Sequence, residues 1–163
     1  MNVNGIPYRT IWLAEDGWAV EIIDQTRLPH EFVTLRLETM KDAATAIADM
    51  WVRGAPLIGA TAAYGMALGM REDATDGGLT TAYDVLMATR PTAVNLRWAL
   101  DDLKALLEPM DAGARNHAAY VRAAEICDED VAICSAIGDH GAALIQDIAA
   151  KRGSGDPVNI LTH

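Results

Sequence analysis

The sequence predicts an α+β domain in which a small antiparallel β-sheet precedes a bundle of helices. Residues 8–37 contain three runs rich in β-branched and aromatic residues, separated by turn signals. After Thr39 the apolar residues recur at the helical spacing of about 3.6. The chain of 163 residues is long enough for one domain with a substantial core, but two full domains would be cramped.

The strands come first along the chain and are predicted at Tyr8–Leu13, Trp18–Ile23 and Phe32–Leu37. An Asp-Gly pair at positions 16 and 17 separates the first two runs, and such a pair between apolar runs is typical of a β-hairpin. The third run alternates apolar and polar residues after the loop around Pro29. We therefore expect three antiparallel strands.

The helices that follow are predicted at residues 39–51, 56–70, 79–88, 92–108 and 114–151. Thr39 and Thr92 are the expected N-caps, a loop is expected at residues 76–78, and Gly138 or Gly141 could break the last helix. The uncharged stretch 54–70 is rich in glycine and alanine, which favours a buried helix packed through small residues over a membrane span. Core positions are expected for the tryptophans and cysteines, which are Trp12, Trp18, Trp51, Trp98, Cys127 and Cys134.

The last residues predict a domain boundary. Residues 153–157 combine glycine, serine and proline, which is typical of a linker, and residues 158–163 resemble a buried strand that opens a parallel sheet. Because a lone strand needs a partner, we expect a further domain in a longer parent polypeptide. The expected division is a sheet-plus-helices domain at 1–152, a linker at 153–157 and the first strand of a truncated domain at 158–163.

The charge balance limits the classes of partner. Thirteen Lys and Arg against 23 Asp and Glu give a net charge of −10, which repels nucleic acid and anionic membranes. An anionic ligand therefore needs a local, positioned cationic site. Two cysteines and no secretory signal at the N-terminus indicate a reduced, cytoplasmic protein.

The first candidate for such a site lies in the segment Val52–Gly59. Pro56 favours a helix start, and the unpaired N–H groups of a helix start attract phosphate. Gly54 allows close backbone approach to an anion, and Arg53 offers a guanidinium fork suited to phosphate oxygens. The alternative is a surface arginine beside a tight turn.

The second candidate lies in the segment Thr89–Leu96. Pro91 keeps Arg90 out of the helical conformation, so this arginine is also presented at a helix start. Two such arrangements would form a cationic pocket if they converged, although the sequence does not show that they meet.

Nucleotide-binding motifs, metal sites and nucleophilic catalytic groups have little support in the sequence. There is no Walker loop and no Gly-x-Gly-x-x-Gly motif after a strand, and no histidine pair has metal-ligand spacing with the cysteines. No hydroxyl residue has an identifiable base beside it. We therefore assign no catalytic residue, metal or organic cofactor to this chain.

Three segments together resemble the methylthioribose-1-phosphate isomerase family: Val52–Gly59, Thr89–Leu96 and Ile137–Ala142, and the closing Ile160–His163 is also similar to it. The resemblance implies a Rossmann-like second domain, a homodimer and binding of the phosphorylated sugar by Arg53, Gly54, Ala55 and Arg90. The implied reaction converts 5-methylthioribose 1-phosphate to 5-methylthioribulose 1-phosphate in methionine salvage, without a cofactor. The family's catalytic cysteine would directly follow His163 and its aspartate belongs to the second domain, so we expect this chain alone to be inactive.

Three alternatives remain open. Regulatory subunits of a translation initiation exchange factor share this architecture without needing the arginine segments. A ribose-1,5-bisphosphate isomerase would accept a second phosphate in place of the methylthio group. A helical interaction domain would have no phosphate affinity.

Overall fold

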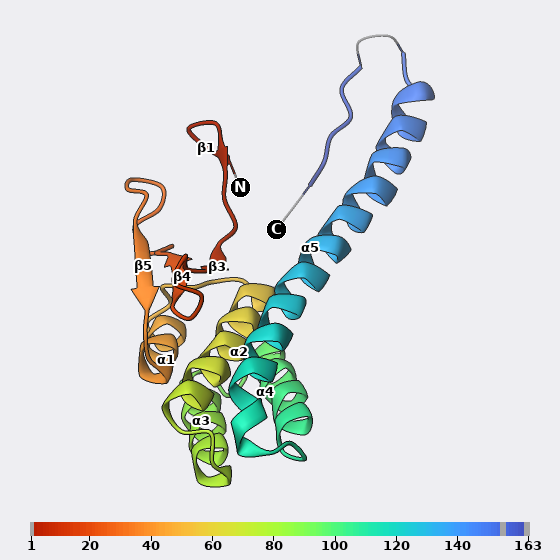
Figure 1. The fold of residues 1–163 in the computed structure, drawn as a ribbon. Helices are drawn as coiled ribbons and strands as arrows, with labels where there is room; N and C mark the ends of the chain where they lie inside the picture. Colours follow the sequence, from red (N-terminus) through yellow and green to blue (C-terminus); the bar gives the residue numbers. More distant parts are fainter. Residues whose placement is uncertain (1, 154–155, 162–163) are drawn as a thin grey trace. The chain divides into compact units, whose positions relative to one another are not determined.

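The structure is a computed structural model that describes residues 2–153 and 156–161. The chain divides into two compact units, Met1–Ile126 and Cys127–His163, and each is described by itself (Figure 1). The first unit holds every strand found among the described residues and four complete helices, so the α+β architecture predicted from the sequence is confirmed.

The first strands form a short hairpin that the sequence analysis missed. Strands β1 (Asn2–Val3) and β2 (Ile6–Pro7) pair antiparallel around Asn4 and Gly5. Both turn residues have positive φ, 52° and 85°, which is the backbone of a tight hairpin turn. The strands are too short to produce the alternating pattern by which longer strands are found.

The three predicted antiparallel strands are present, although each is shorter than expected. They are β3 (Ile11–Leu13), β4 (Val20–Ile23) and β5 (Thr34–Leu37), in the order β3-β4-β5. Ile11 pairs with Ile22, and Val20 pairs with Leu37. The Asp16 carboxylate accepts the backbone N–H groups of Trp18 and Ala19, each at 3.1 Å, which shapes the predicted hairpin turn.

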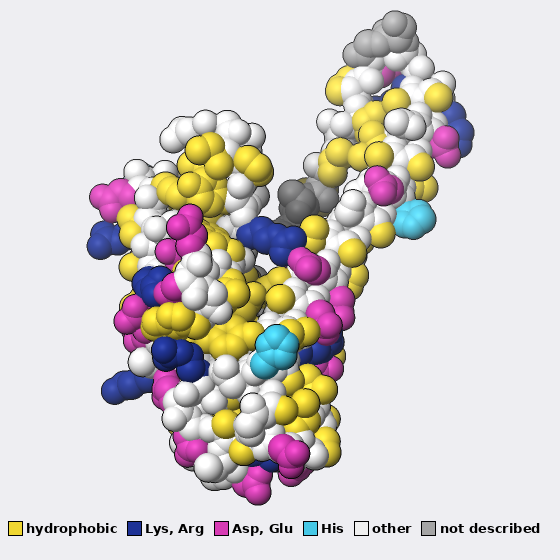
Figure 2. Space-filling model, viewed as in Figure 1, with side chains coloured by type: hydrophobic (Ala, Val, Ile, Leu, Met, Phe, Trp, Pro, Cys, Tyr) yellow, Lys and Arg dark blue, Asp and Glu magenta, His cyan; other side chains and the backbone are white. Residues whose placement is uncertain are grey.

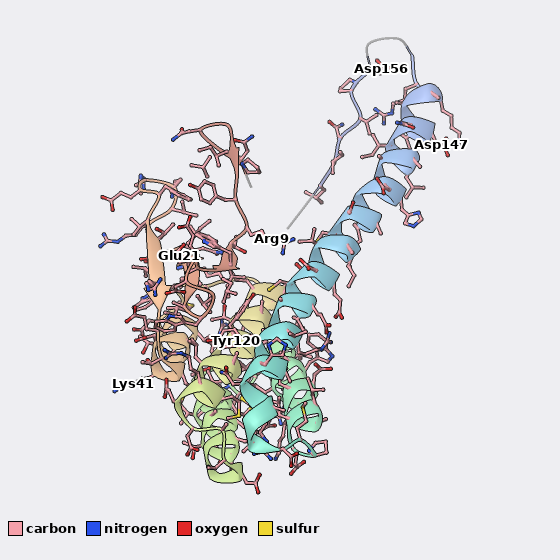
Figure 3. All side chains as sticks on the ribbon, in the orientation of Figure 1. Arg9, Glu21, Lys41, Tyr120, Asp147 and Asp156 are labelled. Carbon is pink, nitrogen blue, oxygen red and sulfur yellow. The ribbon has the colours of Figure 1, made fainter. Side chains whose placement is uncertain are left out.

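Trp18 is half-buried and connects this hairpin to helices α2 (Ala55–Glu72) and α5 (Ala112–Ala150). Arg71 lies over its ring at 3.8 Å and Arg36 at 5.2 Å. The hydroxyl of Tyr120, a residue of α5 labelled in Figure 3, donates to the Trp18 carbonyl at 2.6 Å. None of the four tryptophans is buried, and Trp98 is 48% exposed, so their predicted core positions were wrong. Trp18 instead lies against the guanidinium groups of Arg36 and Arg71, and the Trp12 indole N–H donates to the Glu21 carboxylate at 2.6 Å.

Helix α1 (Met40–Ala48) follows the predicted N-cap, Thr39. The Thr39 side chain accepts the N–H of Asp42, and the Asp42 carboxylate accepts the N–H of Thr39 at 2.9 Å. Burial raises the pKa of Asp42, but the hydrogen bonds from Glu38 and Thr39 outweigh it and leave that pKa below its ordinary value. This reciprocal cap fixes where the chain turns from sheet to helix.

Helix α2 (Ala55–Glu72) is the centre of the bundle. It contacts α1, α3 (Asp76–Thr89) and α4 (Val94–Leu107), and every residue from Leu57 to Met70 is buried. The prediction of a buried helix is confirmed, and no described helix is long and apolar enough to cross a membrane.

Small residues let α2 approach its neighbours. A Cβ at Gly65 would lie 2.9 Å from Leu86, and one at Gly69 would lie 2.8 Å from the Cβ of Ala82. Both distances are shorter than real contacts, so these glycines are what brings α3 close to α2.

We expect Gly69→Ala to destabilise the protein by about 1 kcal/mol, because the added methyl group must push α2 and α3 apart and this outweighs alanine's better helix propensity. Gly138→Ala is the matched control, since nothing lies within 4 Å of that helical position. It should stabilise its helix by about 0.5 kcal/mol. Urea unfolding followed by circular dichroism would measure both, and equal stabilisation by both substitutions would contradict the close packing at Gly69.

Two predicted helix starts were wrong. Helix α3 begins at Asp76, so Gly77 and Gly78 are helical rather than part of a loop, and the Thr75 side chain accepts the Gly78 N–H at 3.1 Å. Helix α4 begins at Val94, and Thr92 does not cap it. A Cβ at Gly78 would lie 2.1 Å from the Asp73 carbonyl oxygen, which shows that this glycine serves close packing rather than a turn.

Helix α5 (Ala112–Ala150) runs through Gly138 and Gly141 without a break. Cys127 is buried as predicted, whereas Cys134 is exposed, and the two form no disulfide. Residues 156–161 form no strand, and the remainder of the predicted linker and strand, 154–155 and 162–163, lies outside the described residues. The predicted division of the domains therefore stays a prediction.

Candidate functional site

The site begins where α1 ends. The Trp51 N–H donates to the Ala46 carbonyl at 2.9 Å, and the Met50 N–H donates to the Ile47 carbonyl at 3.3 Å. These two bonds form a Schellman motif with Met50 in the left-handed conformation, at φ 58°. The chain leaves α1 sharply and enters the turn that carries Arg53.

The N-terminus of α2 follows immediately. Gly54 is its N-cap at φ 92°, a backbone that side-chain-bearing residues rarely adopt, and it has no side chain to cap the helix. The first intrahelical bond runs from the Ile58 N–H to the Gly54 carbonyl at 3.1 Å. The N–H groups of Ala55 and Leu57 therefore have no intrahelical acceptor, and Pro56 has no N–H to satisfy.

The N-terminus of α4 is built in a similar way. The Ala93 N–H donates to the Arg90 carbonyl at 2.9 Å, which closes a tight turn, and Ala93 is the N-cap without a side-chain hydrogen bond. Arg90 has φ −147°, outside the helical range as Pro91 predicted. In contrast, α1 and α3 are both capped by threonine side chains. Among α1 to α4, the two helix starts without a side-chain cap are those beside the two arginines.

A close helix approach brings these two starts together. A Cβ at Gly59 would lie 3.0 Å from the carbonyl oxygen of Asn95, so the first turn of α4 rests almost directly on the backbone of α2. A larger residue at position 59 would separate the two N-termini. Gly59 is therefore the residue that allows them to share one surface.

These residues line a cleft of about 460 Å³. The lining residues are Met50, Arg53, Gly54, Ala55, Ile58, Arg90, Ala93, Val94 and Asn95. The structure thus brings together all four residues that the sequence proposed for sugar phosphate, from two segments that are far apart in the chain. Met50 lies in neither of the two candidate segments, and only the packing at the end of α1 places it here.

The cleft is cationic in an acidic protein. Arg53 and Arg90 make no ion pair with the residues that the structure describes, and no carboxylate is among the lining residues. The partial positive charges of two helix N-termini add to the two guanidinium groups. Acidic side chains are spread over the visible surface elsewhere (Figure 2). This arrangement suits a phosphate group.

The cleft offers binding groups rather than reacting groups. Its described lining contains no Asp, Glu, His, Cys, Ser, Thr, Tyr or Lys side chain. Such side chains are the usual proton donors, proton acceptors and nucleophiles in enzymes. Among the described residues, no three His, Cys, Asp or Glu side chains are grouped so that they could hold a metal ion.

Comparison with known proteins gives consistent matches. The model of the initiation factor 2 subunit family matches residues 51–163. The methylthioribose-1-phosphate isomerase of Paramagnetospirillum magneticum is 63% identical over the whole chain, which spans 44% of that relative's length.

Two solved structures share the fold. The 5-methylthioribose 1-phosphate isomerase of Pyrococcus horikoshii is 38% identical, with a TM-score of 0.69 over 76% of this chain and 36% of that one. The delta subunit of translation initiation factor eIF-2B from A. fulgidus is 32% identical, with a TM-score of 0.69 over 77% of this chain and 38% of that one. The chain therefore corresponds to less than half of each of these relatives.

Proposed function

Because the chain belongs to the initiation factor 2 subunit family, we propose that it is the sugar-phosphate-binding, N-terminal part of a methylthioribose-1-phosphate isomerase. The observation that carries this proposal is the cleft that joins Arg53, Arg90 and two uncapped helix N-termini. A relative named as that isomerase is 63% identical over the whole chain, and among solved structures the isomerase is 38% identical against 32% for the eIF-2B delta subunit. A purely regulatory subunit has no physical need for such a phosphate site.

In this role the chain binds and orients the substrate. The phosphate on C1 of the sugar would accept hydrogen bonds from Arg53, Arg90 and the N–H groups at the start of α2 and α4. Holding that phosphate fixes the position of C1 and C2, between which hydrogen must move after the ring opens. The cleft itself supplies no acid or base for ring opening or hydrogen transfer, so those groups come from outside its lining.

We expect the 163-residue chain to bind 5-methylthioribose 1-phosphate without converting it. Titration calorimetry would measure binding, and NMR of the sugar would detect any ketose product. A chimaera in which residues 1–163 replace the matching segment of the Paramagnetospirillum magneticum isomerase should turn the substrate over. Turnover by the isolated chain would refute its proposed inactivity.

The same measurements distinguish the alternatives. Tighter binding of ribose 1,5-bisphosphate than of 5-methylthioribose 1-phosphate would favour a bisphosphate isomerase. No binding of either sugar or of inorganic phosphate, together with an inactive but folded chimaera, would favour the regulatory-subunit or interaction-domain reading. The homodimer implied by the family resemblance and the cytoplasmic location inferred from the cysteines and the N-terminus stay predictions.

A further inference from the structure

Met50 has an unusual backbone for its residue type. Its φ of 58° lies in the left-handed region, where a side chain crowds the backbone and glycine is favoured. Asn4 is the other non-glycine residue with positive φ among the described residues, and asparagine tolerates this conformation in hairpin turns. Methionine has no polar group with which to compensate.

The fold requires this backbone but not this side chain. The left-handed conformation of Met50 allows the Trp51 N–H to donate to the Ala46 carbonyl. The Trp51 carbonyl in turn accepts the N–H of Gln25 at 2.9 Å. Glycine is the usual residue at this position of a Schellman motif. The Met50 side chain is 45% exposed, so burial in the core does not explain its presence.

The side chain instead lines the cleft that holds Arg53 and Arg90. Together with Ile58 and the 79% exposed Val94, it gives a cationic pocket an apolar portion. Methionine side chains are flexible and polarizable, so they adapt to the shape of the apolar groups they contact. A charged substituent placed against them would lose hydration without gaining a partner.

We infer that Met50 is a specificity-determining residue, kept in a strained backbone conformation because its side chain contacts the uncharged, apolar part of a phosphorylated ligand in the cleft. This inference rests on the proposed sugar-phosphate site and adds the selection of what is attached to the sugar. It predicts a preference for a thioether substituent over a second phosphate.

The test compares Met50→Gly with Met50→Ala. Both should bind 5-methylthioribose 1-phosphate about fivefold more weakly, because the apolar contact is lost. Both should bind inorganic phosphate as the unchanged chain does, because Arg53 and Arg90 remain. Met50→Gly alone should raise the melting temperature by about 3 °C, since it removes the crowding of a left-handed residue.

Affinity would be measured by calorimetry on the 163-residue chain and as KM in the chimaeric isomerase. Met50→Leu should keep the sugar-phosphate affinity within about twofold, because the apolar volume is conserved. Asn4→Gly is the matched control, since it changes the other left-handed residue without touching the cleft lining. It should leave both affinities unchanged.

The outcomes separate the two proposals. If the unchanged chain binds both ligands and neither Met50→Gly nor Met50→Ala alters sugar-phosphate affinity, the role of Met50 is overturned and the phosphate site stands. Equal weakening of phosphate and sugar-phosphate binding would also overturn it, because it would indicate a distorted cleft. If the unchanged chain and chimaera bind neither ligand, the proposed function fails and this inference with it.

Discussion

Arg53→Ala is expected to weaken binding of inorganic phosphate and of 5-methylthioribose 1-phosphate by about 30-fold. Hydrogen bonds from a charged donor contribute about 2 kcal/mol, which corresponds to that ratio of dissociation constants. Arg53 has no ion-pair partner among the described residues, so its removal leaves no protein charge uncompensated. The melting temperature should therefore stay nearly unchanged.

Arg97→Ala is the matched control for this prediction. Arg97 is exposed on α4 close to the same helix start but does not line the cleft. The control should change phosphate affinity less than about twofold, because exposed charges at a distance are screened by salt. Equal losses for both substitutions would show that overall charge, rather than the positioned guanidinium, attracts the ligand. Unchanged affinity in Arg53→Ala would remove Arg53 from the site.

Arg115→Ala should give the largest loss of stability, about 3 kcal/mol. Arg115 is 3% exposed, and its guanidinium donates to acceptors in two segments, 74–76 and 107–110. The acceptors are the carbonyl oxygens of Ala74, Leu107, Glu108 and Met110 and the carboxylate of Asp76. Truncation would remove these five hydrogen bonds from a charged, buried donor, and would leave a cavity where the side chain now packs.

The measurement is urea or thermal unfolding, in which the melting temperature should fall by about 8 °C. Arg115→Lys should recover only part of the loss, because an ammonium group cannot reach several separate acceptors. Arg27→Ala is the control, since its ion pair with Glu31 at 3.8 Å joins two exposed side chains and should contribute less than about 0.5 kcal/mol. A loss in Arg115→Ala no larger than in this control would contradict the role of Arg115.

Local signals in the sequence were sufficient for several features of the fold and the candidate site. The Asp-Gly turn, the Thr39–Asp42 cap and the arginine that precedes each of two helix starts depend on neighbouring residues, and the structure contains them. The glycine- and alanine-rich stretch likewise predicted a buried helix. These features could be predicted because their physical causes act within a few residues along the chain.

Only the tertiary structure decided how these parts meet. Arg115 appeared in the sequence as an ordinary helical arginine, and its burial depends on carbonyl groups from other segments. The sequence placed Arg53 and Arg90 at helix starts, but they share one cleft because Gly59 has no side chain to keep the backbone of α4 away from α2. Helix starts are set by local hydrogen bonding, whereas their convergence is set by which surfaces can approach closely, and that depends on side chains distant in the sequence.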